Sequence, residues 1–167
     1  MRTTIGIEEL ESRLDLLIGK PVWAIRYGGG SCLIIDCGDR VPRQEIWQEH
    51  GSYEGDRAYQ GELTLMISCA WRVEREGVGI VSGTGDLEDE TMLSGPRKLV
   101  GQTVVGVSVE PFIDLLVAFT GGLRLRLFCD QRTDDLDTEF CYTLFVRAEG
   151  AYTVGNNMIT LEKARGY

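Results

Sequence analysis

The sequence predicts an α+β fold that is mostly antiparallel β-sheet. Three observations predict it: a short amphipathic helical pattern early in each half, alternating apolar and polar residues between glycine-rich turns elsewhere, and a recurrence of both patterns 82 residues apart. A chain of 167 residues can bury one substantial core, whereas half of it would have a thin one. We therefore expect residues 1–167 to form a single domain.

The helices are predicted near the start of each half. Apolar residues recur at spacings of three and four from Ile7 to Ile18, which is one face of a helix, and Gly19 supplies a C-terminal stop. Residues 92–101 hold the corresponding apolar positions, but Gly95-Pro96 interrupts them. Because proline is tolerated mainly in the first turn, we expect this second helix to be short or to begin near Pro96.

Antiparallel strands are predicted for most of the remaining chain. Residues 62–73 form the clearest strand, with apolar side chains at nearly every second position from Leu63 to Val73. Further strands are expected at 104–109, 115–119, 123–129 and 140–146, joined by tight glycine turns. The segment 40–61 lacks clean periodicity and is expected to be an irregular excursion, and 83–90 is expected to connect the two halves.

An internal duplication is the strongest organisational feature. Leu17-Ile-Gly-Lys-Pro-Val22 matches Leu99-Val-Gly-Gln-Thr-Val104 at an offset of 82, and weaker matches follow in the same order at offsets of 83, 77 and 73. We expect repeats at about 7–83 and 90–163, each with one helix and four to five strands. They would share one extended sheet or close a barrel; the alternative is two unrelated runs of similar hairpins.

The net charge of the chain limits the classes of partner that it can be expected to bind. The net charge is −9, with 26 acidic and 17 basic residues divided almost evenly between the two halves. A field of this sign repels nucleic acids and anionic membranes, so we expect neither as a partner. Any partner steered by charge would be basic, while the simplest alternative is that the charge serves solubility.

Localisation is predicted from the cysteines and the first residues. The five cysteines form no C-x-x-C pair, and each lies in an apolar run, which favours reduced core thiols. The N-terminal residues lack an apolar signal region, and no apolar run approaches the length of a membrane span. The cytoplasm is the expected compartment.

Residues for catalysis, cofactor binding or metal binding are not recognisable. His50 is the only histidine, it lies in a polar segment, and no G-x-S-x-G nucleophile pattern is present. The glycine-rich stretch 77–85 lacks the following amphipathic helix of a dinucleotide site. We therefore expect a non-enzymatic protein without a cofactor.

Candidate partner contacts are aromatic and acidic residues in the irregular segments. Aromatic anchors beside acidic residues are typical of protein interfaces, although the aromatics could instead cover the sheet and the acidic loops could be merely solvated. Alternating carboxylates in 130–139 could also take calcium, but this loop lacks the EF-hand glycine. The candidates are Trp47, Tyr53, Tyr59, Asp86, Glu88, Asp89, Glu90, Asp134, Asp135 and Asp137.

Three segments carry a resemblance to known proteins: Leu17 to Val22, Gly61 to Val73 with its Cys-Ala-Trp-Arg end, and Leu99 to Val104. The chain resembles small uncharacterised bacterial β-rich proteins with duplicated Leu-x-Gly-x-x-Val hairpins. Some similar families are immunity proteins of polymorphic toxin systems, which neutralise a toxin encoded beside them. The resemblance implies a fold and a binding function, and it supplies no catalytic residue.

Three functions follow as hypotheses. The first is a protein-binding protein of the immunity type that inhibits a basic partner. The second is a small-molecule-binding or hydrolytic domain with a cavity between the repeats, in which His50 or a carboxylate pair supplies acid–base chemistry. The third is a structural homodimer formed by pairing of sheet edges.

Overall fold

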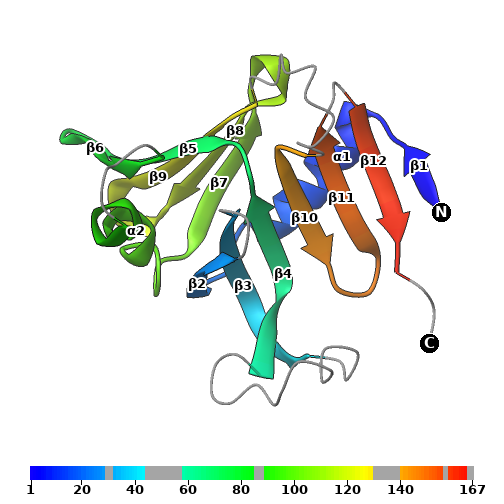
Figure 1. Ribbon diagram of the computed structural model, residues 1–167, viewed down its shortest axis with the longest axis horizontal. Coiled ribbons are helices and arrows are strands. Elements are labelled where there is room, and N and C mark those ends of the chain that lie inside the picture. The colour runs from blue at the N-terminus through cyan, green and yellow to red at the C-terminus, as the bar shows by residue number, and fades with distance from the viewer. Residues whose placement is uncertain (29–31, 44–57, 85–88, 130–139, 156–157, 165–167) are drawn as a thin grey trace.

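The computed structural model describes residues 1–28, 32–43, 58–84, 89–129, 140–155 and 158–164. Its strands form two sheets, and all of the strand pairs within them are antiparallel. The prediction of a mostly antiparallel α+β fold is therefore confirmed (Figure 1). The prediction of one extended sheet or a barrel is wrong, because the described strands divide between two sheets and neither order closes on itself.

The larger sheet has seven strands. Their order across the sheet is β1 (Arg2–Thr4), β12 (Met158–Lys163), β11 (Gly150–Gly155), β10 (Tyr142–Val146), β4 (Tyr59–Ile67), β3 (Cys32–Pro42) and β2 (Val22–Gly28). The smaller sheet has five strands, in the order β6 (Gly79–Gly83), β5 (Ala70–Arg75), β9 (Leu123–Phe128), β8 (Leu115–Phe119) and β7 (Val104–Val109). The predicted excursion at 40–61 is shorter than expected, since β3 extends to Pro42 and β4 begins at Tyr59.

The predicted strand at 62–73 is divided between the two sheets. β4 ends at Ile67 in the larger sheet, and β5 begins at Ala70 in the smaller one. At the bend, the backbone N–H groups of Ser68 and Cys69 both donate to the carbonyl oxygen of Cys141, at 2.8 and 3.0 Å. The alternation runs through the bend because the inner faces of both sheets contribute to one core, so the sequence pattern carries no sign of the break.

The core is a single cluster of buried side chains from both sheets and from the helices. The helix α1 (Ile7–Leu14) buries Leu10 and Leu14 completely and continues into the 3₁₀ turn η1 (Asp15–Leu17). In Figure 1 α1 crosses behind the larger sheet, and Arg13 on this helix donates a hydrogen bond to the Tyr152 hydroxyl of β11 at 3.1 Å. Burial of the apolar faces is the dominant stabilising contribution to such a fold.

The second helix, α2 (Asp89–Arg97), decides between the two alternatives expected for it. It is a short helix of nine residues that does not begin near Pro96, because Pro96 lies in its last turn. A proline removes one hydrogen bond within a helix, and a position close to the C-terminal end limits the damage. The helix packs on β6 and β5, where the Gly95 N–H donates to the Ser82 hydroxyl at 2.9 Å.

The two Leu-x-Gly-x-x-Val segments pair with each other. The Gly19 N–H donates to the Val104 carbonyl at 2.8 Å, and the Gly101 N–H donates to the Val22 carbonyl at 2.8 Å. These two bonds are related by the 82-residue offset, and both glycines adopt a positive φ, of 84° and 85°. The two segments therefore have the same local backbone conformation and pair with each other symmetrically.

The sheet orders extend this correspondence. Strands β2-β3-β4 continue into β10-β11, and strands β7-β8-β9 continue into β5-β6, so each half completes the sheet of the other. The weaker match at offset 77 aligns β4 with β10, whereas the sheet orders align β4 with β9. The first half contributes α1 and β2–β6, and the second contributes α2 and β7–β12. A common origin of the halves stays a prediction.

Candidate functional site at the junction of the two sheets

Most of the predicted partner contacts lie outside the described residues. These are Trp47, Tyr53, Asp86, Glu88, Asp134, Asp135 and Asp137, together with His50. Asp89 and Glu90 form the first residues of α2, and their side chains are not described. Tyr59 opens β4 opposite Pro42 and is 40% exposed.

The net charge is confined to three of the segments outside the described residues. Segments 44–57, 85–88 and 130–139 carry charges of −3, −2 and −4, and the rest of the chain has 15 acidic and 15 basic residues. The net charge is therefore divided evenly between the two halves of the chain but unevenly between its segments. A neutral framework carries three acidic segments, and these include most of the predicted acidic contacts.

Two of the acidic segments start from the same end of the smaller sheet. Residue 84 precedes the first of them, and the Thr84 N–H donates to the Trp71 carbonyl of β5 at 3.0 Å. Phe128 pairs with Ala70 of β5, directly before Cys129 and the start of the 130–139 segment. We call this region, where β4 passes into β5, the junction end. The 44–57 segment starts at the opposite end of β4, about 27 Å away at the rise per residue of an antiparallel strand.

Three cysteines lie at the junction end. Cys69 and Cys129 lie one position beyond the paired residues Ala70 of β5 and Phe128 of β9, and Cys141 precedes β10, where its carbonyl accepts from the Cys69 N–H at 3.0 Å. We call these three residues the thiol cluster. Cys69 and Cys129 are partly exposed, whereas Cys141 is buried. A fourth cysteine, Cys32, has its Sγ 3.1 Å from the Ser68 hydroxyl beside the cluster.

The contacts between the thiols shift their pKa values in opposite directions. The hydrogen bond with Cys129 lowers the pKa of the Cys141 thiol, against the effect of its burial. The hydrogen bonds to Cys141 and Cys69, followed by burial, raise the pKa of the Cys129 thiol. Burial raises the pKa of the neighbouring Tyr142 hydroxyl.

A strained turn lies against the thiol cluster. Asp114 accepts a hydrogen bond from the Cys129 N–H through its carboxylate at 2.6 Å, and the Tyr142 hydroxyl donates to the Ile113 carbonyl at 3.3 Å. Residues 110–114, which connect β7 to β8, are called the Phe112 turn. They include the short 3₁₀ segment η4 (Pro111–Ile113).

The Phe112 turn combines backbone strain with exposure. Phe112 and Ile113 have φ values of 63° and 65°, in the left-handed region that L-residues rarely adopt, and Ile113 is β-branched as well. Ile113 packs against the core, but the Phe112 side chain is 90% exposed, so its burial offsets none of the strain at Phe112. Strain in a position of this kind is typical of a functional contact. Phe112 is not among the residues predicted from the sequence, although the proline before it is a turn signal.

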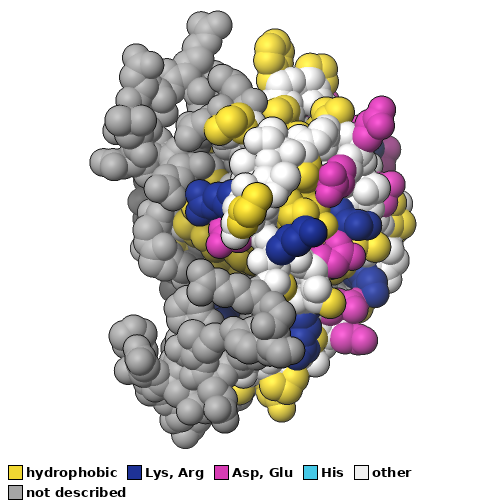
Figure 2. Space-filling model, turned by 90° about the vertical axis from the view of Figure 1, so that its right-hand side faces the viewer, with side chains coloured by type: hydrophobic (Ala, Val, Ile, Leu, Met, Phe, Trp, Pro, Cys, Tyr) yellow, Lys and Arg dark blue, Asp and Glu magenta, His cyan; other side chains and the backbone are white. Residues whose placement is uncertain are grey.

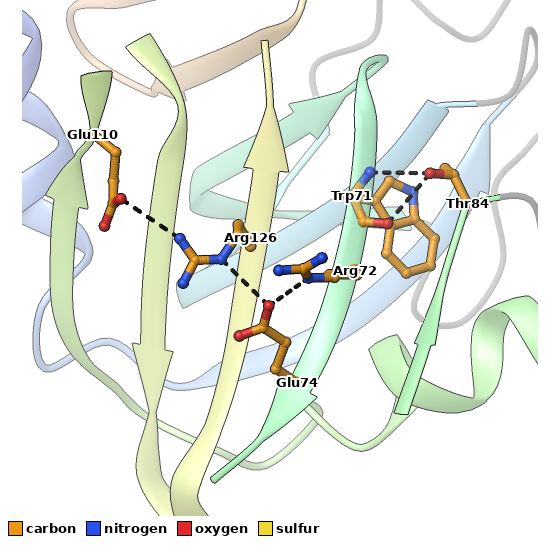
Figure 3. A network of polar contacts seen from close by, with 6 residues as sticks. All are labelled: Trp71, Arg72, Glu74, Thr84, Glu110 and Arg126. Carbon is orange, nitrogen blue, oxygen red and sulfur yellow. Dashed lines mark hydrogen bonds and ion pairs between the residues drawn. The ribbon is translucent and has the colours of Figure 1, made fainter. Parts of the chain in front are cut away.

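A charged network on the outer face of the smaller sheet holds the base of this turn. Figure 3 shows Arg126 between two carboxylates: its Nη1 lies 3.6 Å from Glu110 Oε2, and its Nε donates to Glu74 Oε1 at 3.3 Å. Arg72 forms a further ion pair with Glu74. The network links β9 and β5 to Glu110, the first residue of the Phe112 turn. The turn is therefore connected to the smaller sheet by ion pairs as well as by the backbone.

The pKa of Glu74 reflects this network. Burial alone would raise the pKa of the Glu74 carboxyl, but Arg72 and Arg126 together hold it below the ordinary value. The side chain is 18% exposed, so screening by water weakens these ion pairs only in part.

The described surface on the side of β12 and β1 is mixed in charge. Figure 2 shows acidic and basic side chains interspersed on this face. Ion pairs join Arg2 to Glu162 and Arg13 to Glu149 in this part of the molecule. This face therefore presents no acidic patch of described residues that would select a basic partner.

Comparison with models of protein families, with curated proteins and with solved structures finds no match. Within the described ranges, no group of three or more His, Cys, Asp or Glu side chains is arranged to hold a metal ion. Among the helices that the structure describes, none is both long enough and apolar enough to cross a membrane.

Proposed function

We propose that this protein is a non-enzymatic protein-binding protein, and that it uses the Phe112 turn as the anchor for a basic partner. The observation that carries the proposal is the exposure of Phe112, whose side chain is 90% exposed on a backbone of positive φ. Aromatic side chains, phenylalanine among them, are enriched at the cores of protein interfaces. The strain at Phe112 is not offset by burial of its own side chain, which fits a side chain whose burial occurs in a complex.

The location of the acidic segments supports a basic partner. Segments 85–88 and 130–139 start from the junction end, and the Cys129 N–H at the root of the second is bound by Asp114 of the Phe112 turn. Their combined charge would accelerate encounter with a basic surface and disfavour acidic competitors. An aromatic anchor beside acidic segments would thus provide both affinity and selectivity.

The kind of partner that we propose is a toxin, which this protein would inhibit as an immunity-type protein. The resemblance in the Leu-x-Gly-x-x-Val segments supports this assignment, and the five cysteines, all free in the structure, are compatible with action in the cytoplasm. Such an inhibitor needs a stable framework and a complementary surface, and it needs no catalytic set. The framework here is the pair of sheets, and the surface is the junction end.

The test is co-expression of this chain with the product of the gene beside it. We expect that product to arrest growth when expressed alone, and growth to recover when this chain is present. The Phe112→Ala variant should lose the rescue, whereas Val78→Ala should retain it, since Val78 is 73% exposed on the hairpin between β5 and β6. A neighbouring product that is harmless, or that stays toxic with this chain present, would remove the immunity assignment.

A binding measurement separates the charge from the aromatic anchor. For the purified pair, we expect affinity to fall as salt concentration rises, because the acidic segments interact through screened charges. Replacing Asp134, Asp135 and Asp137 together with asparagine should slow association and flatten the salt dependence. Phe112→Ala should accelerate dissociation and leave the salt dependence unchanged. Affinity that is independent of salt would contradict the role of the acidic segments.

A structural homodimer is the second candidate, and a specific edge favours it. β6 is an outer strand of the smaller sheet with no charged residue, and Val78 and Ile80 beside and within it are 73% and 65% exposed. Uncharged edges of this kind are suited to pairing with another strand. Size measurement by light scattering would reveal a dimer, and Ile80→Lys should dissociate it.

A further inference from the structure

The hairpin β5–β6 of the smaller sheet and the hairpin β10–β11 of the larger sheet are built alike. In each turn, an N–H donates at 3.0 Å to the carbonyl three residues earlier: Val78 to Arg75, and Glu149 to Val146. The next residues, Gly79 and Gly150, both have a positive φ and pair with the residue that carries this carbonyl. β6 and β11 therefore occupy equivalent positions in the two sheets.

The two hairpins differ in what lies beyond them. β11 pairs along its far edge with β12, from Gly150 opposite Lys163 to Gly155 opposite Met158, and β12 pairs in turn with β1. β6 is the last strand of its sheet among the strands that the structure describes. The smaller sheet therefore ends at the edge that β12 covers in the larger sheet.

The edge of β6 has the composition of a strand that can accept another strand. β6 contains no charged residue and no proline, which are the residues that commonly protect edge strands from pairing. Val78 and Ile80 are 73% and 65% exposed beside and within it. The comparison with β11 also gives the orientation: an added strand would run antiparallel to β6, as β12 runs antiparallel to β11.

The core-facing side of this edge indicates the kind of strand that fits. In the larger sheet, β12 covers the equivalent side with two buried apolar residues, Ile159 and Leu161. Val81 of β6 and Leu93 of α2, the helix that packs on β6, are only partly buried against the core. A second copy of β6 would offer one such side chain, Val81, because Ile80 lies opposite Glu74 on the outer face. An extended segment with two apolar residues at alternating positions fits this edge better.

We propose that β6 is a strand-accepting edge, at which an extended segment of the protein partner adds antiparallel to the smaller sheet. This inference rests on the proposed binding function, and it states how the partner is held in addition to the contact at Phe112. The main-chain hydrogen bonds of the added strand contribute affinity, and its two apolar side chains, covering Val81 and Leu93, select the segment.

Hydrogen exchange measured by mass spectrometry tests the proposal on the full-length protein, alone and with the purified product of the neighbouring gene. We expect the amides of residues 78–81 to exchange at least about tenfold more slowly in the complex, because the added strand protects them. Residues 160–162 provide the internal reference, since they already pair with β11 on one side and with β1 on the other. Their exchange should not change.

A pair of matched variants tests the edge by affinity. Ile80→Lys should weaken binding of the neighbouring product at least about fivefold, because a lysine on an edge strand opposes the addition of another strand. Met158→Lys is the control: Met158 is 50% exposed in β12, which lies between β1 and β11, and this variant should bind like the wild type. Circular dichroism establishes that both variants are folded, and hydrogen exchange of the unmodified protein decides if one of them is not.

Each other outcome has a definite meaning. A complex that forms without protection of residues 78–81 would overturn this inference and leave the proposed function in place. Protection in the protein alone that increases with its concentration would identify a second copy as the added strand, and would overturn the inference as well. A neighbouring product that does not bind would overturn both the proposed function and this inference.

Discussion

Replacing Phe112 with glycine should stabilise the protein while it destroys the proposed contact. An L-residue in the left-handed region costs about 1–2 kcal/mol, and glycine does not incur this cost. Glycine in turn stabilises the unfolded chain by about 0.5–1 kcal/mol through its greater conformational freedom. Because the Phe112 side chain is 90% exposed, its removal loses almost no burial. The net expectation is a gain of about 0.5–1 kcal/mol in the free energy of unfolding.

Chemical denaturation monitored by tryptophan fluorescence measures this gain, and the melting temperature should rise by about 1–4 °C for a chain of this size. Phe112→Ala is the matched control, because alanine retains a Cβ and therefore most of the strain. Its stability should remain within about 0.5 kcal/mol of the wild type. Ile113→Gly should instead be destabilising, since Ile113 packs against the core. A destabilised Phe112→Gly variant, or an equal gain from alanine, would refute the claim that the turn is strained.

The remaining predictions concern the framework that supports the junction end. Gly95→Ala should destabilise the protein by about 1–2 kcal/mol in a denaturant titration, because the new Cβ would collide with the Ser82 hydroxyl. The control is Gly106→Ala, whose Cβ would meet only Ala118 at 3.8 Å, and it should change the free energy of unfolding by less than about 0.5 kcal/mol. The carboxylate of Glu74 has a lowered pKa in the folded state, so its contribution is present above the unfolded value of 4.5 and is lost as pH falls through the folded value. Glu74→Gln should therefore be less stable than wild type near neutral pH, and the difference should shrink under acid; a difference that is constant with pH would contradict the network in Figure 3.

The sequence predicted the elements whose periodicity is local. The first helix, the turn at Gly19 and the alternating strands follow from spacing and residue type alone. The break at Ser68 could not be predicted, because the apolar alternation from Ile67 to Trp71 satisfies two different sheets equally well. The bend is held by hydrogen bonds to the carbonyl of Cys141, a residue that lies 73 positions after Ser68 in the chain.

The candidate site was predictable only in its composition. The acidic segments can be recognised in the sequence. That the rest of the chain has no net charge became clear only when the described strands defined where these segments begin and end. The thiol cluster gave no signal, because no two of its cysteines have the spacing of a metal or redox motif. Sheet order, which pairs β5 with β9 and β4 with β10, brings the three thiols together.

The internal correspondence of the two halves provides a comparison within one chain. At the 82-residue offset that relates β2 to β7 and β3 to β8, Phe112 corresponds to Gly30 in a Gly-Gly-Gly sequence. Glycine is the residue that a positive φ ordinarily requires, and the first half carries it in the connection where the second half carries Pro111, Phe112 and Ile113. Ile113 packs against the core, but folding alone gives no reason for an exposed phenylalanine on a left-handed backbone. The substitution that would restore the residue of the first half, Phe112→Gly, is therefore the change that separates the requirements of the fold from those of the partner.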